Sequence, residues 1–386
     1  HAGRFGQQVP TFSKLSPSGV LPSDARASSA NSSSGPLVFS KPSSAVAPSH
    51  GCVISANSSS GPIGFCNRPT RPTGCPHRCV FCNQWIVSGR EEGRSEPEGG
   101  LAAAREFLRF RGVRQGPAHI AFFGGNFLGL PWERSRRLLT AASEWVHAGE
   151  LDGIRFSTRP DTVDSQALDR IGDFPVACVE LGVQSMDDDV LRQSRRGHTA
   201  ADSISASARI RKAGFSLVIQ LMPGLPGDSP AESLRSAKAA AGCAPDAVRI
   251  YPTVVLDHTR LAEIFRAGAY EPLTLEDALE RSADMHELFA GKGIPVIRTG
   301  LHPLAPDETA NVLAGPYHPA FGFLVKSRVK RRRLAHEISR MLGRDSSSPV
   351  VIRLRIPMRE KEEYIGYRGE NIEYLGALFA PARIVR

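Results

Sequence analysis

Three closely spaced cysteines are the clearest chemical feature of the sequence. Cys75, Cys79 and Cys82 stand in the string GCPHRCVFCNQ with the spacing CxxxCxxC. Three thiolates on one short loop can bind three irons of a four-iron, four-sulfur cluster, and such clusters normally take four cysteine ligands. No fourth cysteine follows at matching spacing, so one iron is left open for a small molecule. The spacing therefore predicts an iron–sulfur cluster with an exchangeable ligand position.

A zinc site is the alternative interpretation, with His77 or Cys66 as the fourth ligand. Zinc sites typically use CxxC pairs set well apart rather than three cysteines in one loop, so the spacing favours the cluster. The chain has seven cysteines, an odd number, which is typical of metal ligation in a reducing compartment and not of a disulfide framework. We therefore expect a cytoplasmic protein, with organelle targeting as the less favoured alternative.

Short apolar segments alternate with helical stretches around and beyond this motif. The predicted strands are His119–Phe123, Ile154–Thr158, Ala177–Val183, Leu217–Met222, Ala247–Tyr251 and Ile294–Ile297. The predicted helices between them include residues 132–147, 201–213, 231–242 and 274–290. Strands that alternate with helices form an α/β fold with a parallel sheet and right-handed crossovers. Chemistry in such folds lies at the carboxyl ends of the strands, where the motifs of this chain also fall.

Seven strings occur in a fixed order and together resemble a known family. They are GCPHRCVFCNQ, FFGG at 122–125, STRPD at 157–161, ELGVQS at 180–185, RRGHT at 195–199, MPGLPGD at 222–228 and RIYPTVV at 249–255. They resemble the radical-SAM half of the elongator catalytic-subunit family, especially bacterial relatives. The resemblance implies a partial (β/α)6 barrel over residues 67–325, a four-iron, four-sulfur cluster and bound S-adenosylmethionine. It also implies reductive cleavage of S-adenosylmethionine, with an electron donor as a partner.

The resemblance also implies residues that contact the methionyl part and the adenine of S-adenosylmethionine. Gly124 and Gly125 match a glycine pair whose backbone meets the methionyl amino group, because glycine allows so close an approach. Arg196 matches a polar residue near the methionyl carboxylate. The aromatic Phe81, before the third cysteine, suits a group that packs near the adenine or in the core. The glycine pair is followed by Asn126, where many relatives have an acid or serine.

Three further positions match the part of the family site near the ribose. Gln184 corresponds to a polar residue that relatives use there, and Gln220 falls where related enzymes often place another ribose or adenine contact. Ser157 stands where relatives often carry an acid, so one contact is weaker in this chain. No catalytic side chain is identified from the sequence.

The two ends of the chain differ in composition from its middle. Residues 1–66 are rich in Ser, Pro, Gly and Ala, with one acid, and we expect them to be disordered. Residues 326–349 form a basic run and a linker. Residues 350–386 read as a small β-α-α-β unit in which Gly366 and Gly369 bracket a GxxG loop. This unit resembles a KH domain, whose GxxG loop clamps a nucleic-acid backbone; a helical hairpin that packs on the barrel is the alternative.

The net charge of +9 is compatible with a polyanionic partner such as RNA. We therefore predict a radical-SAM enzyme that acts on RNA, with tRNA as the favoured class. The alternatives are a radical-SAM protein similar to coproporphyrinogen oxidase and an RNA-binding protein with a structural cluster. About 60 residues follow Val325, too few for the acetyltransferase domain of elongator subunits, so acetyl transfer is not expected. No stretch is apolar enough to cross a membrane.

Overall fold

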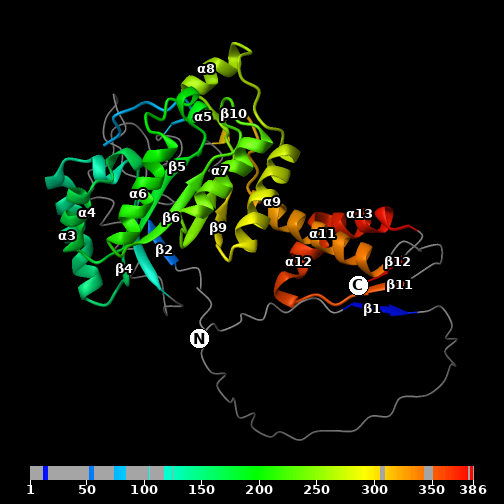
Figure 1. Cartoon of the computed structure of the whole chain (residues 1–386). Helices are drawn as coiled ribbons and strands as arrows, with labels where there is room; N and C mark the ends of the chain where they lie inside the picture. Colours follow the sequence, from blue (N-terminus) through cyan, green and yellow to red (C-terminus); the bar gives the residue numbers. More distant parts are fainter. Residues whose placement is uncertain are drawn as a thin grey trace, which may run out of the picture. The chain divides into compact units, whose positions relative to one another are not determined.

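A computed structural model gives the fold of two separate parts of the chain. It describes residues 12–15, 52–55, 74–83, 104, 117–123, 125–304, 309–342, 351–380 and 383–385. The larger compact unit lies within residues 50–329, and the smaller one combines residues 1–49 and 330–386. Figure 1 shows both units.

The larger unit is built on a parallel sheet. Its strands are β2 (Cys52–Ser55), β3 (Ala118–Phe122), β4 (Gly153–Thr158), β5 (Val176–Gln184), β6 (Ser216–Leu221), β7 (Ala247–Ile250) and β9 (Val296–Thr299). They are hydrogen-bonded in the order β2-β3-β4-β5-β6-β7-β9, and every pair is parallel. Because the order follows the chain without reversal, the sheet winds in one direction, as in a barrel and unlike a doubly wound fold. The predicted partial (β/α) barrel and its six strands are confirmed.

Strand β2 was not predicted. It lies in the serine-rich stretch expected to be disordered, and its residues Cys52–Ser55 pair in register with Ala118–Ala121 of β3. A second short strand in that stretch, β1 (Phe12–Leu15), belongs to the smaller unit. The rest of residues 1–66 lies outside the described residues. Both strands are four residues long and gain their hydrogen bonds from partners far away in the sequence, which local composition does not encode.

Helices cover one face of the sheet. They are α3 (Trp132–His147), α4 (Ser165–Gly172), α6 (Ala200–Lys212), α7 (Pro230–Gly242) and α9 (Leu275–Gly291). The chain also forms the shorter helices α5 (Asp188–Gln193), which follows β5, and α8 (Arg260–Arg266), which packs on the apolar cluster around Val80. The predicted helices at 132–147, 201–213, 231–242 and 274–290 are confirmed as α3, α6, α7 and α9. Side-chain caps define several starts; Thr199 and Asp202, for example, form a capping box at the start of α6.

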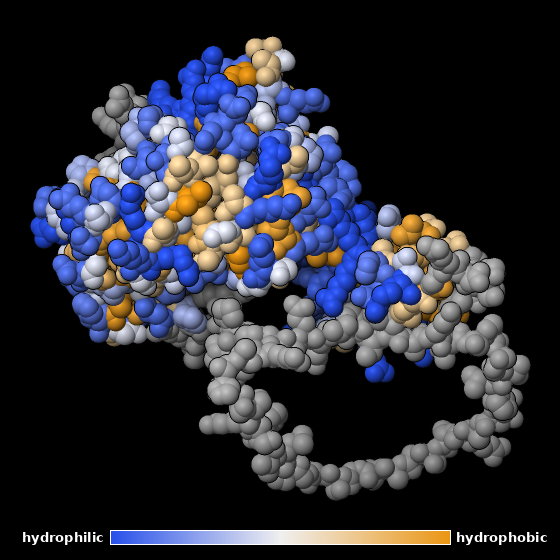
Figure 2. All heavy atoms as spheres, in the orientation of Figure 1, coloured by the Kyte–Doolittle hydropathy of each residue, from blue (hydrophilic) through white to orange (hydrophobic). Residues whose placement is uncertain are grey.

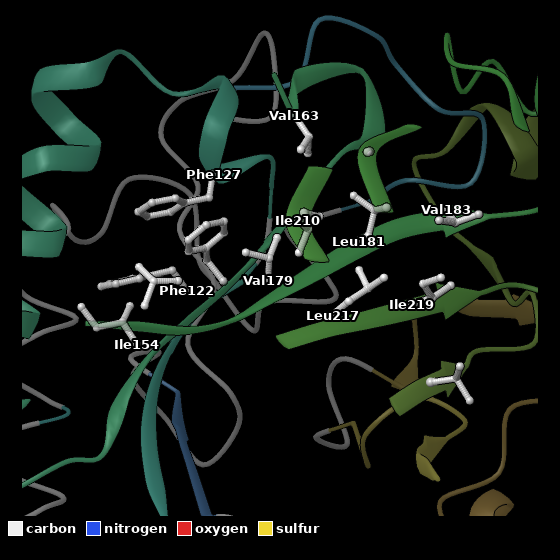
Figure 3. Close-up of a cluster of buried hydrophobic side chains, with 14 of the residues drawn as sticks. Phe122, Phe127, Ile154, Val163, Val179, Leu181, Val183, Ile210, Leu217 and Ile219 are labelled. Atoms are coloured by element: carbon white, nitrogen blue, oxygen red, sulfur yellow. The ribbon is translucent and has the colours of Figure 1, made fainter. Parts of the chain in front are cut away.

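Alternate strand residues pack against these helices and form the main core. Figure 3 shows part of it, including Val179 and Leu181 of β5, Leu217 and Ile219 of β6, and Ile210 of α6. Since side chains of a strand alternate between the two faces, the intervening residues lie on the opposite face of the sheet. We call this opposite side the inner face. It carries polar residues as well as a small apolar cluster, described below.

The smaller unit is a three-stranded sheet with short helices. Its strands are β1, β11 (Val351–Leu354) and β12 (Arg383–Val385), in the order β1-β11-β12. Between β11 and β12 the chain forms α12 (Lys361–Ile365) and α13 (Glu370–Leu378), so the predicted β-α-α-β unit is confirmed. Helix α11 (Phe321–Leu342) contains the basic run and contributes Leu334 and Ile338 to the core of this unit.

The face of the molecule drawn in Figure 2 is mainly hydrophilic. None of the helices in the described residues is both long enough and apolar enough to span a membrane.

The larger unit also contains a separate antiparallel pair of strands, β8 (Val255–Leu256) and β10 (Val312–Ala314). In the chain, β8 precedes α8 and β10 precedes α11.

Candidate functional site

The loop that carries the three cysteines is anchored to elements that follow the strands. Gly74, just before Cys75, accepts a hydrogen bond from Asn126 Nδ2 at 2.6 Å through its carbonyl oxygen. Val80 donates to the Ser194 carbonyl at 3.1 Å and accepts from the Leu261 amide at 2.7 Å. Asn83 Nδ2 donates to the Asp257 carbonyl at 2.7 Å. Segments that follow β3, β5 and β8 therefore hold the cysteine loop at the carboxyl-end side of the sheet.

Gly74 cannot be replaced without moving this loop. Its φ is +80°, and a Cβ at this position would lie 2.2 Å from the backbone oxygen of Asn126. Both the left-handed backbone and the close approach require glycine. The entry of the cysteine loop is thus packed directly on the turn after β3.

Asn126 is a hub that the sequence prediction did not include in the site. The side chain is 1% exposed, and its Oδ1 accepts hydrogen bonds from Thr158 Oγ1 at 2.7 Å, Thr162 Oγ1 at 2.8 Å and the Arg159 amide at 3.0 Å. With its bond to Gly74, it ties the cysteine loop to the STRPD string. In the sequence, Asn126 is visible only as a departure from the family pattern after the glycine pair.

Two buried arginines converge on the middle cysteine. Arg196 Nη1 lies 3.2 Å from Cys79 Sγ, and Arg159 Nη1 lies 3.7 Å from the same sulfur. Both guanidinium groups are almost fully buried. Asp161 holds Arg159 through bonds of 2.9 and 3.2 Å to its Nε and Nη2. Charge of this sign stabilises a thiolate, the form in which cysteine binds metal.

The electrostatics of the neighbouring groups agree with this arrangement. Burial raises the pKa of the Cys75 thiol to about 11, while the charges of Arg159 and Arg196 oppose that shift. Burial alone would lower the pKa of Arg159, but its bond to Asp161 outweighs burial and raises it. Burial, followed by the two arginines, lowers the pKa of His198 to about 3. His198 is therefore a neutral side chain behind the site.

The predicted ribose-side residues lie at the ends of neighbouring strands. Gln184 ends β5 with a φ of +72°, a conformation that is rare outside glycine and often found at functional sites. Its Oε1 accepts a hydrogen bond from Gln220 Nε2, in β6, at 3.1 Å. The structure thus brings these two predicted residues together. Ser157 lies on β4 in register with Glu180 of β5.

The remaining predicted positions have different environments. Arg196 donates to the Gly182 carbonyl as well as to Cys79. Phe81 packs against an apolar cluster that includes Val80 and Leu261. Gly125 precedes Asn126 in the turn after β3, and Gly124 lies outside the described residues.

The donor set fits an iron–sulfur cluster. A cluster binds each thiolate to a different iron, so three cysteines of one short loop can hold it. Of the zinc alternatives, the ring of His77 lies against Gly197, and Cys66 is outside the described residues. Three thiols on one anchored loop, with two guanidinium groups at Cys79, fit the cluster.

Comparison with known families identifies the family to which the sequence belongs. The sequence of residues 71–240 matches the family described as the radical SAM superfamily, and residues 245–331 match the radical-SAM C-terminal domain. This chain belongs to the radical-SAM enzymes. The matched region begins before the cysteine loop and extends through the sheet, as the ordered strings predicted.

Individual relatives agree with the resemblance to elongator catalytic subunits. The chain is 28% identical over 235 residues to a tRNA uridine(34) acetyltransferase of Dehalococcoides mccartyi, covering 53% of this chain and 51% of the relative. It is 33% identical over 244 residues to elongator complex protein 3 of Saccharomyces cerevisiae, covering 52% and 44%. The chain thus spans about half the length of these relatives.

A solved structure supports the fold. The archaeal Elp3 of Methanocaldococcus infernus matches with a TM-score of 0.53 and 23% identity, over 61% of this chain and 59% of that one. This likeness agrees with the one-way order of strands in the sheet.

Proposed function

We propose that this radical-SAM protein holds a four-iron, four-sulfur cluster on Cys75, Cys79 and Cys82 and cleaves S-adenosylmethionine reductively. The observation that carries the proposal is the anchored cysteine loop, with the Arg159 and Arg196 guanidinium groups at Cys79. When bound, the reduced cluster supplies the electron that breaks the sulfonium carbon–sulfur bond. The chain's own residues position the reactants around it.

Each of these residues has a distinct task in the proposal. Gly124 and Gly125 let the backbone approach the methionyl amino group, and Arg196 pairs with the methionyl carboxylate. Gln184 and Gln220, already joined by a hydrogen bond, present amide groups on the ribose side. Ser157 and Phe81 have the same assignments as the resemblance gives them, near the ribose and the adenine.

The decisive experiment is cluster reconstitution under anaerobic conditions, followed by dithionite and S-adenosylmethionine. Formation of 5′-deoxyadenosine and methionine by the brown protein is the expected result. Brown protein that forms neither product would contradict the proposal and favour a structural cluster. An electron-donor protein is expected to replace dithionite in the cell.

We further propose that the substrate is RNA, with tRNA as the favoured class. The support is the net charge of +9 and the relatives whose names refer to tRNA. An activity similar to that of coproporphyrinogen oxidase is the alternative. Hydrogen transfer from bound tRNA to 5′-deoxyadenosine, followed with deuterated tRNA, distinguishes them, because a porphyrinogen substrate would leave the deuterium in the tRNA.

The Arg159 charge is expected to make the cluster easier to reduce. Arg159→Gln removes a positive charge from beside Cys79, so the additional electron is less well stabilised and the midpoint potential falls. Arg159→Lys retains the charge and should keep the potential close to that of the wild type. The measurement is a redox titration of the reconstituted cluster followed by electron paramagnetic resonance. Arg170→Gln, at an exposed position of α4, is the control, and equal potentials in all four proteins would disprove this role.

The GxxG loop of the smaller unit is expected to contribute to RNA binding. Gly366 and Gly369 have φ values of +81° and +90°, and Arg368 between them lies 5.2 Å from the exposed ring of Tyr367. Removing residues 346–386 should weaken tRNA binding about tenfold and flatten its salt dependence, because phosphate contacts are lost. Arg368→Gln in the full chain should cause part of that loss, whereas unchanged affinity in both would support the hairpin alternative.

A further inference from the structure

The inner face of the sheet carries a buried charge network that the proposed site does not use. Glu180 of β5 forms ion pairs with Arg155 of β4 at 2.5 Å and with Arg249 of β7 at 2.8 Å. Its side chain is 4% exposed, and those of the two arginines are 10% and 13% exposed. One carboxylate therefore bridges two guanidinium groups, and both of its oxygens are engaged.

A third arginine lies on the same face. The register pairs Val248 with Val296 and then Arg249 with Arg298, so β9 carries one extra residue, Ile297, at a bulge. At such a bulge two successive residues oppose one partner. Ile297 packs on the inner-face apolar cluster of Cys178, Val218 and Ala247. The register therefore places Arg298 beside Arg249 on the inner face.

The next residue supports this assignment. Thr299 is paired with Ile250, whose side chain belongs to the core under the helices. The Thr299 hydroxyl is also 2.6 Å from His286 Nε2 in α9. Thr299 is thus on the helix-covered face, and Arg298 before it is on the inner face.

Three guanidinium groups consequently lie on the inner face, and Glu180 pairs with two of them, Arg155 and Arg249. Among the described residues, the side chain of Arg298 forms no hydrogen bond or ion pair, and it stands directly across from Arg249, a pairing of like charges that is unfavourable. Burial acts to lower the pKa of Arg249, but the nearby Glu180 carboxylate outweighs burial and raises this pKa above its ordinary value. Arg249 therefore stays positively charged. Ser157, in register with Glu180, adds no second carboxylate.

We propose that the inner face binds an oxyanion, a carboxylate or a phosphate, through Arg298 and Arg249. The planar guanidinium group matches both anions through two parallel hydrogen bonds. Arg249 Nη1 is 3.1 Å from the Tyr251 hydroxyl and its guanidinium lies over the Phe123 ring, which directs the pair toward the carboxyl ends of β7 and β3. This inference rests on the proposed function, since the anion is assigned to the substrate.

The test measures binding of inorganic phosphate and of acetate to the full chain by calorimetric titration at constant ionic strength. Acetamide is the uncharged probe. Arg298→Gln should weaken binding of the preferred anion about tenfold or more, the loss expected for one charged hydrogen bond. Because an unpaired like charge is removed, the variant should melt at the same or a higher temperature than the wild type. Arg136→Gln, at an exposed position of α3, is the matched control and should change neither quantity.

The outcomes distinguish a phosphoryl ligand from a carboxylate ligand, and they test this inference separately from the proposed function. Tighter binding of phosphate assigns a phosphoryl group, and tighter binding of acetate assigns a carboxylate. Equal anion affinity in Arg298→Gln and the wild type overturns the inference, as does a lower melting temperature without loss of affinity. The titration requires neither cluster nor S-adenosylmethionine. A chain that binds anions but cleaves no S-adenosylmethionine therefore contradicts only the proposed function, and the reverse result contradicts only this inference.

Discussion

Cys79→Ser is expected to lose most of the bound iron and to reduce formation of 5′-deoxyadenosine by at least about a hundredfold. Serine has almost the same shape as cysteine, but its hydroxyl is not ionised at neutral pH and is a poor ligand for iron–sulfur clusters. Cys79 is also the cysteine that both guanidinium groups contact, so its replacement removes the ligand and leaves two buried charges without a thiolate. Iron and sulfide content, the absorbance of the cluster and product formation are the measurements.

Cys243→Ser is the matched control for this experiment. Cys243 follows α7, and its thiol donates a long bond of 3.6 Å to the Ala239 carbonyl, which a serine hydroxyl can also make. Iron content and product formation should remain at wild-type levels. Stoichiometric zinc in the wild type, or iron that is retained in Cys79→Ser, would contradict the assignment of the cluster to this loop.

The parts of the fold that the sequence predicts are those with a local signal. Strands such as Leu217–Met222 combine apolar, β-branched runs with a following turn, and each precedes a helix with a clear amphipathic pattern. The observed β6 differs by one residue at each end. Strand β2 has no such signal, because it is held by pairing with β3 across more than 60 residues. The existence of β2 therefore depends on tertiary pairing, which the local composition does not indicate.

The same distinction holds for the candidate site. The cysteine spacing and the glycine pair are visible in the sequence, whereas the role of Asn126 depends on a contact with Gly74, 52 residues away. Arg159 belongs to the STRPD string, yet its contact with Cys79 spans 80 residues. An arginine followed by Pro160 and Asp161 is compatible with a simple surface turn. Only the fold shows that this arginine is buried and directed at a cysteine.

The Glu180 carboxylate is expected to be essential for stability. Glu180→Gln retains the size of the side chain but removes the carboxylate charge that pairs with both Arg155 and Arg249. Breaking a buried ion pair by removing one partner costs about 3–5 kcal/mol, because the remaining charge is left uncompensated. Urea unfolding should show this loss. Glu133→Gln, which removes an exposed pair with Arg136, is the control and should remain within about 0.5 kcal/mol of the wild type.

A double-mutant cycle with Arg249→Met distinguishes loss of charge balance from loss of packing. If uncompensated guanidinium groups cause the instability, Glu180→Gln should cost less in the Arg249→Met background, because fewer charges are left unpaired. An equal cost in both backgrounds would assign the effect to packing of the Glu180 side chain instead. The result also bears on the inner face as a binding surface. Once Glu180 is fully occupied by Arg155 and Arg249, Arg298 is the charge that an incoming anion can neutralise, so the network that stabilises the sheet also leaves one cation for a ligand.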